Sequence, residues 1–158
     1  TSDLEEVIHD LNHQVFESAN GENFITFFIA LIDLKEKKLT YVNAGHNPPF
    51  LMTSNGNIEK LDKGTLVLGA LRDIPFLEIG SAKIEKTQTL LLYTDGLTEA
   101  FNESEEEFGP ERVIDILNHN IDTKPALILS NILKEISDFI GKRALSDDIT
   151  LLACQYHV

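Results

Sequence analysis

The first hydrophobic pattern along the chain has the spacing of an amphipathic helix. Apolar residues recur every three or four positions over residues 3–19, and Ser2 with Glu5 has the spacing of a capping box. The stripe consists of Leu4, Val7, Ile8, Leu11 and Val15. This spacing predicts a helix over residues 3–19 that is stopped by Asn20 and Gly21 and turns the stripe toward a core.

The pattern then changes to one that is typical of β-strands. An apolar, β-rich run over residues 24–33 is separated by the polar turn 35–38 from a second run over 39–44, which predicts a hairpin. Proline, asparagine and glycine punctuate the residues that follow. Further strands are expected over 48–52, 58–61 and 79–84, with a turn at 54–57.

The second half of the chain begins with a nearly continuous apolar run over residues 89–94, which predicts a strand covered on both faces. Pro110 opens a short helix that turns Val113, Ile114 and Leu117 inward. The stripe of a longer helix comprises Leu129, Ile132, Leu133, Ile136, Phe139 and Ile140. Gly141 is a natural stop for that helix, and residues 149–156 form a last strand.

This order of elements predicts an α+β sandwich of mostly antiparallel strands rather than a doubly wound sheet. The chain has 158 residues, of which 42% are apolar, and no second-domain linker. We therefore expect residues 1–158 to form a single domain. Cys154 is the only cysteine, which excludes an internal disulfide and a cysteine-rich zinc site. We expect Cys154 to fill the core of the last strand.

The charge balance narrows the set of partners. Thirteen Lys and Arg against 26 Asp and Glu give a net charge of −13, which repels a phosphate backbone and makes nucleic acid an unfavourable partner. The sequence has neither a run of eighteen apolar residues nor a secretory leader, so we expect a cytoplasmic location without membrane contact. Divalent cations held by carboxylates would still let an acidic protein act on phosphate esters.

Carboxylates stand at the ends of two predicted strands. Asp95 follows the apolar strand 89–94, while Asp147 and Asp148 precede the last strand. Adjacent antiparallel strands would bring these acids to one edge, where a hard divalent cation would relieve their repulsion. The alternative is that Asp95-Gly96 is a simple turn and that the later pair lies in a solvated loop, and this alternative is favoured for each motif taken alone.

Three motifs taken together favour the first interpretation. They are Tyr41-Val42-Asn43-Ala44-Gly45-His46-Asn47-Pro48-Pro49, Leu90 to Ala100 around Thr94-Asp95-Gly96, and Ser146-Asp147-Asp148-Ile149-Thr150-Leu151-Leu152, with Leu68-Gly69, Phe108-Gly109 and Glu111-Arg112 in support. From about residue 24 onward the chain resembles the sporulation-type branch of the metal-dependent (PP2C-like) protein serine/threonine phosphatases. The resemblance implies a four-layer α-β-β-α sandwich of antiparallel sheets. It also implies two Mn2+ or Mg2+ ions that activate water against phosphoserine or phosphothreonine.

The resemblance carries specific residues with it. It implies that Asp95 and Asp147 are metal ligands and act catalytically through the bound metal. Asp148 is a secondary candidate, because an adjacent side chain should point differently. Family members carry further acidic ligands upstream of the position matching Thr1, so we expect an N-terminally incomplete domain with little activity of its own. The expected partner is a phosphoprotein such as an antagonist of an anti-sigma factor, and the choice between monomer and homodimer stays open. The other interpretation is a phosphatase-like module that binds a protein without catalysis.

Histidines offer competing sites. His9 and His13 have the spacing of a zinc-peptidase pair, but they lie opposite the apolar stripe, and Asp10 is shorter than the usual glutamate base. We expect His46 to shape its turn by hydrogen bonding. The acidic segment 103–107 is interpreted as a solvated loop, with a substrate-recognition flap as the alternative. Tyr93 stands where phosphatases with a covalent mechanism have a nucleophilic aspartate, which excludes that mechanism.

Overall fold

The computed structural model describes residues 2–18, 22–53 and 55–156. Three predictions fall outside the described part of the chain. They are the capping box, which needs the Ser2 side chain, the helix stop at Asn20 and Gly21, and the part of the predicted turn at Ser54. The chain divides into two compact units, Thr1–Pro48 with Leu61–Ile84 and Pro49–Lys60 with Glu85–Val158. We describe each unit by itself, and a single domain over residues 1–158 stays a prediction.

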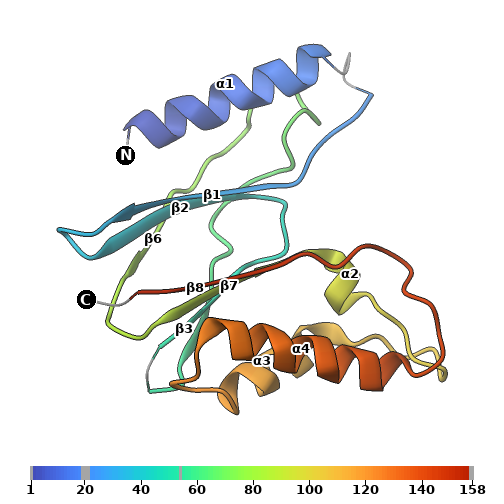
Figure 1. Cartoon of the computed structure of the whole chain (residues 1–158). Coiled ribbons are helices and arrows are strands. Elements are labelled where there is room, and N and C mark those ends of the chain that lie inside the picture. The colour runs from blue at the N-terminus through green and yellow to red at the C-terminus, as the bar shows by residue number, and fades with distance from the viewer. Residues whose placement is uncertain (1, 19–21, 54, 157–158) are drawn as a thin grey trace. The chain divides into compact units, whose positions relative to one another are not determined.

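The first unit places one helix on a small sheet (Figure 1). Its elements are α1 (Ser2–Ser18), β1 (Phe27–Asp33), β2 (Lys38–Ala44), β5 (Gly64–Thr65) and β6 (Gly80–Lys83). The hairpin pairs β1 with β2 from Phe27 opposite Ala44 to Asp33 opposite Lys38. Strand β2 also pairs with β6 in the antiparallel sense and with β5 in the parallel sense. The predicted helix and hairpin are confirmed, with the first strand beginning at Phe27.

The helix α1 buries a narrower row than its pattern predicts. Leu4 and Ile8 pack with Val42 of β2, but Val7 is 41% exposed, so its predicted place in the buried stripe is wrong. The buried row continues four positions after Ile8 with Asn12, which is 2% exposed. Residues four apart lie on the same helix face, and Val7 lies at the edge of that row.

The second unit is an antiparallel sheet with helices over one face (Figure 1). Its strands are β3 (Phe50–Met52), β4 (Ile58–Lys60), β7 (Thr89–Tyr93) and β8 (Leu151–Gln155), in the order β4-β3-β7-β8. Its helices are α2 (Asp95–Thr98), α3 (Gly109–Asn118) and α4 (Pro125–Ile140). The α+β class with antiparallel sheets is confirmed.

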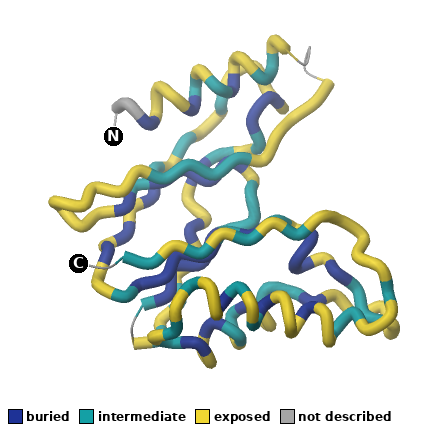
Figure 2. The backbone as a smooth tube through the Cα atoms, viewed as in Figure 1, coloured by how far each residue is buried: buried dark blue, intermediate teal, exposed yellow. Residues whose placement is uncertain are grey.

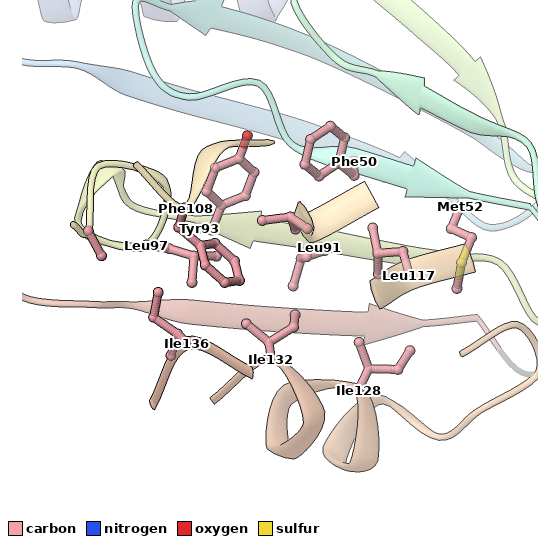
Figure 3. Packing of buried hydrophobic residues seen from close by; sticks show 12 residues of the cluster. Phe50, Met52, Leu91, Tyr93, Leu97, Phe108, Leu117, Ile128, Ile132 and Ile136 are labelled. Carbon is pink, nitrogen blue, oxygen red and sulfur yellow. The ribbon is translucent and has the colours of Figure 1, made fainter. Parts of the chain in front are cut away.

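The core of this unit lies between the sheet and the helices α3 and α4. Figure 3 shows Phe50, Leu91 and Tyr93 of the sheet among the packed side chains, with helical partners Leu117, Ile128, Ile132 and Ile136. Figure 2 shows the same division along the backbone, with β3 and β7 almost entirely buried. The burial of β7 on both faces is as its continuous apolar run predicts.

Two predicted core positions in this unit are wrong. Leu133 is 51% exposed, because α4 buries the row Ile128, Ile132 and Ile136, and Leu133 is turned by one residue from that row. Cys154 is exposed rather than a core residue. Alternate residues of β8 point to opposite faces, and Leu151 and Ala153 are the ones that pack on the core.

In the described parts of the chain, no helix combines the length and the apolar character needed to cross a membrane.

Candidate metal centre

The strands β7 and β8 continue to pair beyond their formal ends through a threonine. The Thr94 N–H donates to the Thr150 carbonyl at 3.1 Å, and the Thr150 N–H donates to Thr94 Oγ1 at 2.9 Å. The same hydroxyl donates to the Asp148 carbonyl at 3.2 Å. Thr94 therefore fixes the two chain segments that carry the predicted acidic ligands.

Asp95 begins α2 directly after this threonine. Thr94 has extended backbone angles and Asp95 is the first helical residue, so the chain turns sharply at the strand end. Leu97 is fully buried and anchors the short helix in the core. The Gly96 N–H donates to Asp95 Oδ1 at 3.0 Å, while the Asp95 residue itself is exposed. The strand and the helix thus hold an oriented carboxylate in solvent.

Gly96 brings this turn into contact with the later acidic segment. A Cβ atom at Gly96 would lie 2.4 Å from the Asp148 carbonyl oxygen and 3.3 Å from the Asp147 carbonyl carbon. Real Cβ atoms do not approach a backbone oxygen at 2.4 Å. Only glycine permits this approach of the two segments.

Asp147 and Asp148 lie on the opposite side of that contact. The Asp148 N–H donates to Asp147 Oδ1 at 2.7 Å, and both residues are exposed. Asp148 contributes to this junction through its backbone carbonyl, which accepts a hydrogen bond from the Thr94 hydroxyl. We call Asp95, Asp147 and Asp148 the acid edge. The structure brings the segments that carry these residues together at one end of the β7–β8 pair, and their role as metal ligands stays a prediction.

The donor set fits part of a site for a hard divalent cation. Carboxylate oxygens are the ligands that Mn2+ and Mg2+ prefer, and those of Asp95 and Asp147 are each oriented by a backbone N–H. Within residues 2–18, 22–53 and 55–156, no group of three or more His, Cys, Asp or Glu side chains is placed to hold a metal. The acid edge therefore offers Asp95 and Asp147 as ligand candidates, with Asp148 next to Asp147 in the sequence, and is not a complete coordination sphere.

Tyr93 ends β7 two residues before Asp95 and is buried in the core. Its ring is 4% exposed and stacks on Phe50 with centroids 5.3 Å apart and planes 14° apart (Figure 3). Burial, and to a smaller extent the negative charge of Glu111, together raise the pKa of Tyr93 to about 12. The phenol is neutral at physiological pH, so its role at this position is to pack.

The Asn43 turn in the other unit has a structural role. Asn43 is 4% exposed, donates from Nδ2 to the Leu61 carbonyl at 3.2 Å and accepts the His46 N–H on Oδ1 at 2.8 Å. Gly64 fits only because it has no side chain, since a Cβ there would lie 1.8 Å from the Asn43 carbonyl oxygen. We use the name Asn43 turn for residues 43–46. The hydrogen bond expected of His46 is present through its backbone N–H.

His9 and His13 belong to no metal-binding group among the described residues. His13 Nε2 lies 3.5 Å from Asp73 Oδ1, and both side chains are at least half exposed. Asn12, between the two histidines on α1, donates to the carbonyls of Leu71 and Arg72 and accepts the Gly69 N–H. The same helix that carries the zinc-like spacing thus uses a buried asparagine to hold a loop.

Sequence reasoning missed the residues that position the acids. Thr94 and Gly96 were visible only as parts of a Thr-Asp-Gly motif, and their partners are more than fifty positions away. The loop 103–107 is exposed as expected, yet it is tightly organised. The Asn102 side chain accepts the N–H groups of Ser104 and Glu106. An asparagine two positions before a serine was the available signal for that turn.

Comparison with known proteins gives the acid edge its context. The family model described as Stage II sporulation protein E (SpoIIE) matches residues 1–157. Protein IcfG of Synechocystis sp. is 35% identical over 130 residues, covering 82% of this chain and 20% of IcfG. The phosphoserine phosphatase RsbU of Bacillus subtilis is 28% identical over 156 residues, covering 97% of this chain and 45% of RsbU.

Solved structures share the fold. The SiaA-PP2C domain of Pseudomonas aeruginosa superposes with a TM-score of 0.72 at 18% identity, covering 83% of this chain and 51% of that chain. The phosphatase domain of the cell fate determinant SpoIIE from Bacillus subtilis, presoaked with Mn, gives a TM-score of 0.67 at 15% identity, covering 99% and 72%.

The chain spans less than half the length of the curated relatives IcfG and RsbU. The match of a family model to almost every residue settles membership all the same. The fold is that of PP2C phosphatase domains, and the acid edge lies on two of the three motifs that carry the resemblance. The chain belongs to the SpoIIE family of PP2C-like phosphatase domains.

Proposed function

We propose that the protein containing this chain hydrolyses phosphoserine or phosphothreonine on a partner protein, with Asp95 and Asp147 as ligands of Mn2+ or Mg2+. The observation that carries the proposal is the close approach of Gly96 to the backbone of Asp147 and Asp148, which joins the two exposed segments on which these aspartates lie. The naming of RsbU as a phosphoserine phosphatase and the Mn-soaked SpoIIE phosphatase domain support the activity and the metal.

Divalent ions, when bound, would lower the pKa of a coordinated water and offset the charge of the phosphoryl group. The residues of this chain would hold and orient them. Asp95 and Asp147 each have one oxygen engaged by a neighbouring N–H, which fixes the carboxylate plane and leaves the second oxygen for a cation. Thr94 keeps both segments in register. Two carboxylates do not complete the coordination of two ions, so the proposal requires ligands beyond those described here.

The exposure of the acid edge suits a phosphoryl group carried by a protein. Asp95, Asp147 and Asp148 are all exposed. An open cleft of about 650 Å³ lies elsewhere in the unit, between α3 and α4, where Arg112, His119 and Asn131 are among its lining residues. A group presented on a protein surface reaches an open rim without entering a pocket. As the family resemblance implies, we propose an antagonist protein of an anti-sigma switch as the substrate class.

The test measures Mn2+-dependent release of phosphate from a phosphoserine peptide by the whole protein that carries this chain. We expect Asp95→Asn and Asp147→Asn each to lower kcat/KM at least about 100-fold, because each removes a charged metal ligand. Asp115→Asn is the matched control, since Asp115 is exposed on α3 and its side chain makes no hydrogen bond or ion pair in the described part of the chain. The control should keep wild-type activity.

Full activity in both ligand variants would refute the ligand assignment. No hydrolysis by the wild-type protein over a range of Mn2+ and Mg2+ concentrations, with a phosphoprotein still bound, would favour the non-catalytic binding module instead. That second function is favoured by one observation: among the described residues, no three acidic, histidine or cysteine side chains are arranged to hold a metal ion.

A further inference from the structure

The segment between α4 and β8 carries Asp147 and is exposed over most of its length. Of residues 141–148, all of which the structure describes, only Arg143 is partly buried. Thr94 holds the end of this segment through the Asp148 carbonyl. Arg143 lies four positions before Asp147, so the contacts of Arg143 determine how the first part of the segment runs.

Arg143 is held by the acidic loop that follows α2. Its Nη1 group donates to the Asn102 carbonyl at 3.1 Å and to Glu105 Oε1 at 2.7 Å. Its guanidinium carbon lies 5.5 Å from the centroid of the Phe101 ring, within the range of a cation–π contact. The neighbouring backbone joins in, because the Lys142 N–H donates to Glu103 Oε1 at 3.4 Å. We call this set of contacts the Arg143 clamp.

The receiving loop is built to stay in place. The Asn102 Oδ1 atom accepts from Ser104 and Glu106, and its Nδ2 group donates to Glu106 Oε2 at 2.9 Å. Glu105 adopts a φ of 62°, a left-handed conformation that a non-glycine residue adopts at a cost. Glu105 adopts this conformation while its side chain forms an ion pair with Arg143. The loop offers the arginine a fixed partner rather than a mobile one.

The loop is also rooted beside Asp95. Ala100 is 1% exposed, and its carbonyl accepts the Phe108 N–H at 2.8 Å, which closes the base of the loop in the core. The helix α2, which begins at Asp95, leads directly into this base. The Arg143 clamp therefore links the segment just before Asp147 to the segment just after Asp95. It is a second tie between them, separate from the Thr94 hydrogen bonds.

We propose that Arg143 is a positioning residue that sets the approach of Asp147 to Asp95 and thereby the affinity of the acid edge for a divalent cation. The inference rests on the proposed metal role of these two aspartates. An exposed ion pair adds little to global stability, so the effect of its loss is expected in the local geometry of residues 144–149. Arginine suits the task because its planar group serves a carbonyl, a carboxylate and a ring at once.

The first test measures Mn2+ binding to the whole protein by titration calorimetry, without substrate. We expect Arg143→Ala to weaken binding about tenfold, as loss of a group that orients metal ligands does. The Mn2+ affinity of Arg143→Lys should lie between those of wild type and Arg143→Ala, because lysine keeps the positive charge but lacks the planar guanidinium group. Lys142→Ala is the matched control: it removes the same charge one position away, from a side chain without a hydrogen bond or ion pair in the described part of the chain.

The unfolding temperature separates positioning from a purely stabilising role. If Arg143 is a positioning residue, the unfolding temperature of Arg143→Ala should stay within about 2 °C of wild type while its dissociation constant for Mn2+ rises. Glu105→Gln, which acts from the other side of the clamp, should weaken binding in the same direction. The double variant should be no weaker than Arg143→Ala alone, since the two residues act as a unit. Equal Mn2+ affinity in Arg143→Ala and wild type would overturn the inference.

Hydrogen exchange of the metal-free protein separates this inference from the proposed function. Amides of residues 144–149 should exchange faster in Arg143→Ala than in Lys142→Ala, because the segment has lost the clamp and keeps only its tie to Thr94. Unchanged exchange would overturn the clamp even in an active phosphatase. A wild-type protein that binds no Mn2+ would refute the proposed metal site, and the exchange rates would still decide whether the clamp exists.

Discussion

The acid edge and the Asn43 turn come from motifs that carry the same family resemblance, yet they use polar side chains in opposite ways. In the Asn43 turn the asparagine is 4% exposed, and its amide is consumed by the Leu61 carbonyl and the His46 N–H. At the acid edge the carboxylates are exposed. Asp95 and Asp147 each accept a neighbouring backbone N–H on one oxygen. A motif can therefore be recognisable because it holds the fold or because it faces a ligand.

Burial distinguishes the two cases physically. A buried polar group must be satisfied inside the protein, so its removal leaves partners unpaired and costs stability. An exposed carboxylate is solvated, so its removal costs the fold little and is felt by whatever it binds. Substitutions at the two sites should therefore differ strongly in their effect on the free energy of unfolding.

The largest effect is expected from Asn43→Ala. It leaves the Leu61 carbonyl and the His46 N–H without their partner, which should lower the free energy of unfolding by about 2 to 4 kcal/mol. Urea unfolding of the chain measures this loss. Asn118→Ala is the control, because Asn118 is exposed and should shift stability by less than about 0.5 kcal/mol. Equal effects of the two variants would contradict a structural role for the turn.

A smaller effect on the free energy of unfolding is expected from the ionisation of Tyr93, which lies two residues before Asp95. Its pKa is raised from 10.0 to about 12 in the fold, so the folded state favours the neutral phenol. The resulting stability is present below pH 10 and is lost as the pH rises through about 12, an amount of about 2 kcal/mol. Comparing unfolding of wild type and Tyr93→Phe between pH 9 and 12 isolates this contribution. A constant difference across that range would be inconsistent with it.

Threonine to valine at two positions should give effects of opposite sign. Thr94→Val removes both hydrogen bonds of the hydroxyl that joins β7 to β8 and should cost about 1 kcal/mol. Thr65→Val removes a buried hydroxyl that has no hydrogen-bond partner among the described residues, and should add about 0.5 to 1 kcal/mol. Thermal unfolding of both variants checks the sign, and a loss of stability in Thr65→Val would show that its hydroxyl is satisfied.

The smallest effect on stability is expected at the acid edge itself. Asp95→Asn and Asp147→Asn keep the shape of each side chain and should change the metal-free free energy of unfolding by less than about 0.5 kcal/mol. Chemical denaturation in the presence of a chelator measures this change. A loss of several kcal/mol would mean that the carboxylates stabilise the fold, and the contrast with the Asn43 turn would no longer hold.

The sequence was sufficient to predict the elements and a shared strand end for the acidic segments, because both depend on local pattern, whereas the metal role of the acids stays a prediction. The run over residues 89–94 predicted a strand buried on both faces, and the residues at its end and before the last strand predicted one shared edge. Periodicity failed at the margins of helices, where Val7 and Leu133 lie beside the buried row and not on it. The choice between those positions depends on the tertiary contacts of the helix, which local spacing does not contain.

The supporting residues could not be predicted for a different reason. Arg143 and Glu105 are ordinary charged residues in exposed segments, and nothing local distinguishes them from their neighbours Lys142 and Glu106. Their roles arise from a pairing across 38 positions of sequence. Asn12 was hidden in the same way inside a helix, with its partners almost sixty positions away.

The pairing of β7 with β8 also bears on the order in which the protein assembles. The residues joined at the end of this pair, Thr94 and Thr150, are separated by 56 positions, whereas α3 and α4 lie within that stretch and pack on each other after a short connection. Closing a long loop is slower than forming local helical contacts. We therefore expect the segments that carry Asp95 and Asp147 to come together late in folding, so that the proposed site would bind its cation only in the finished fold.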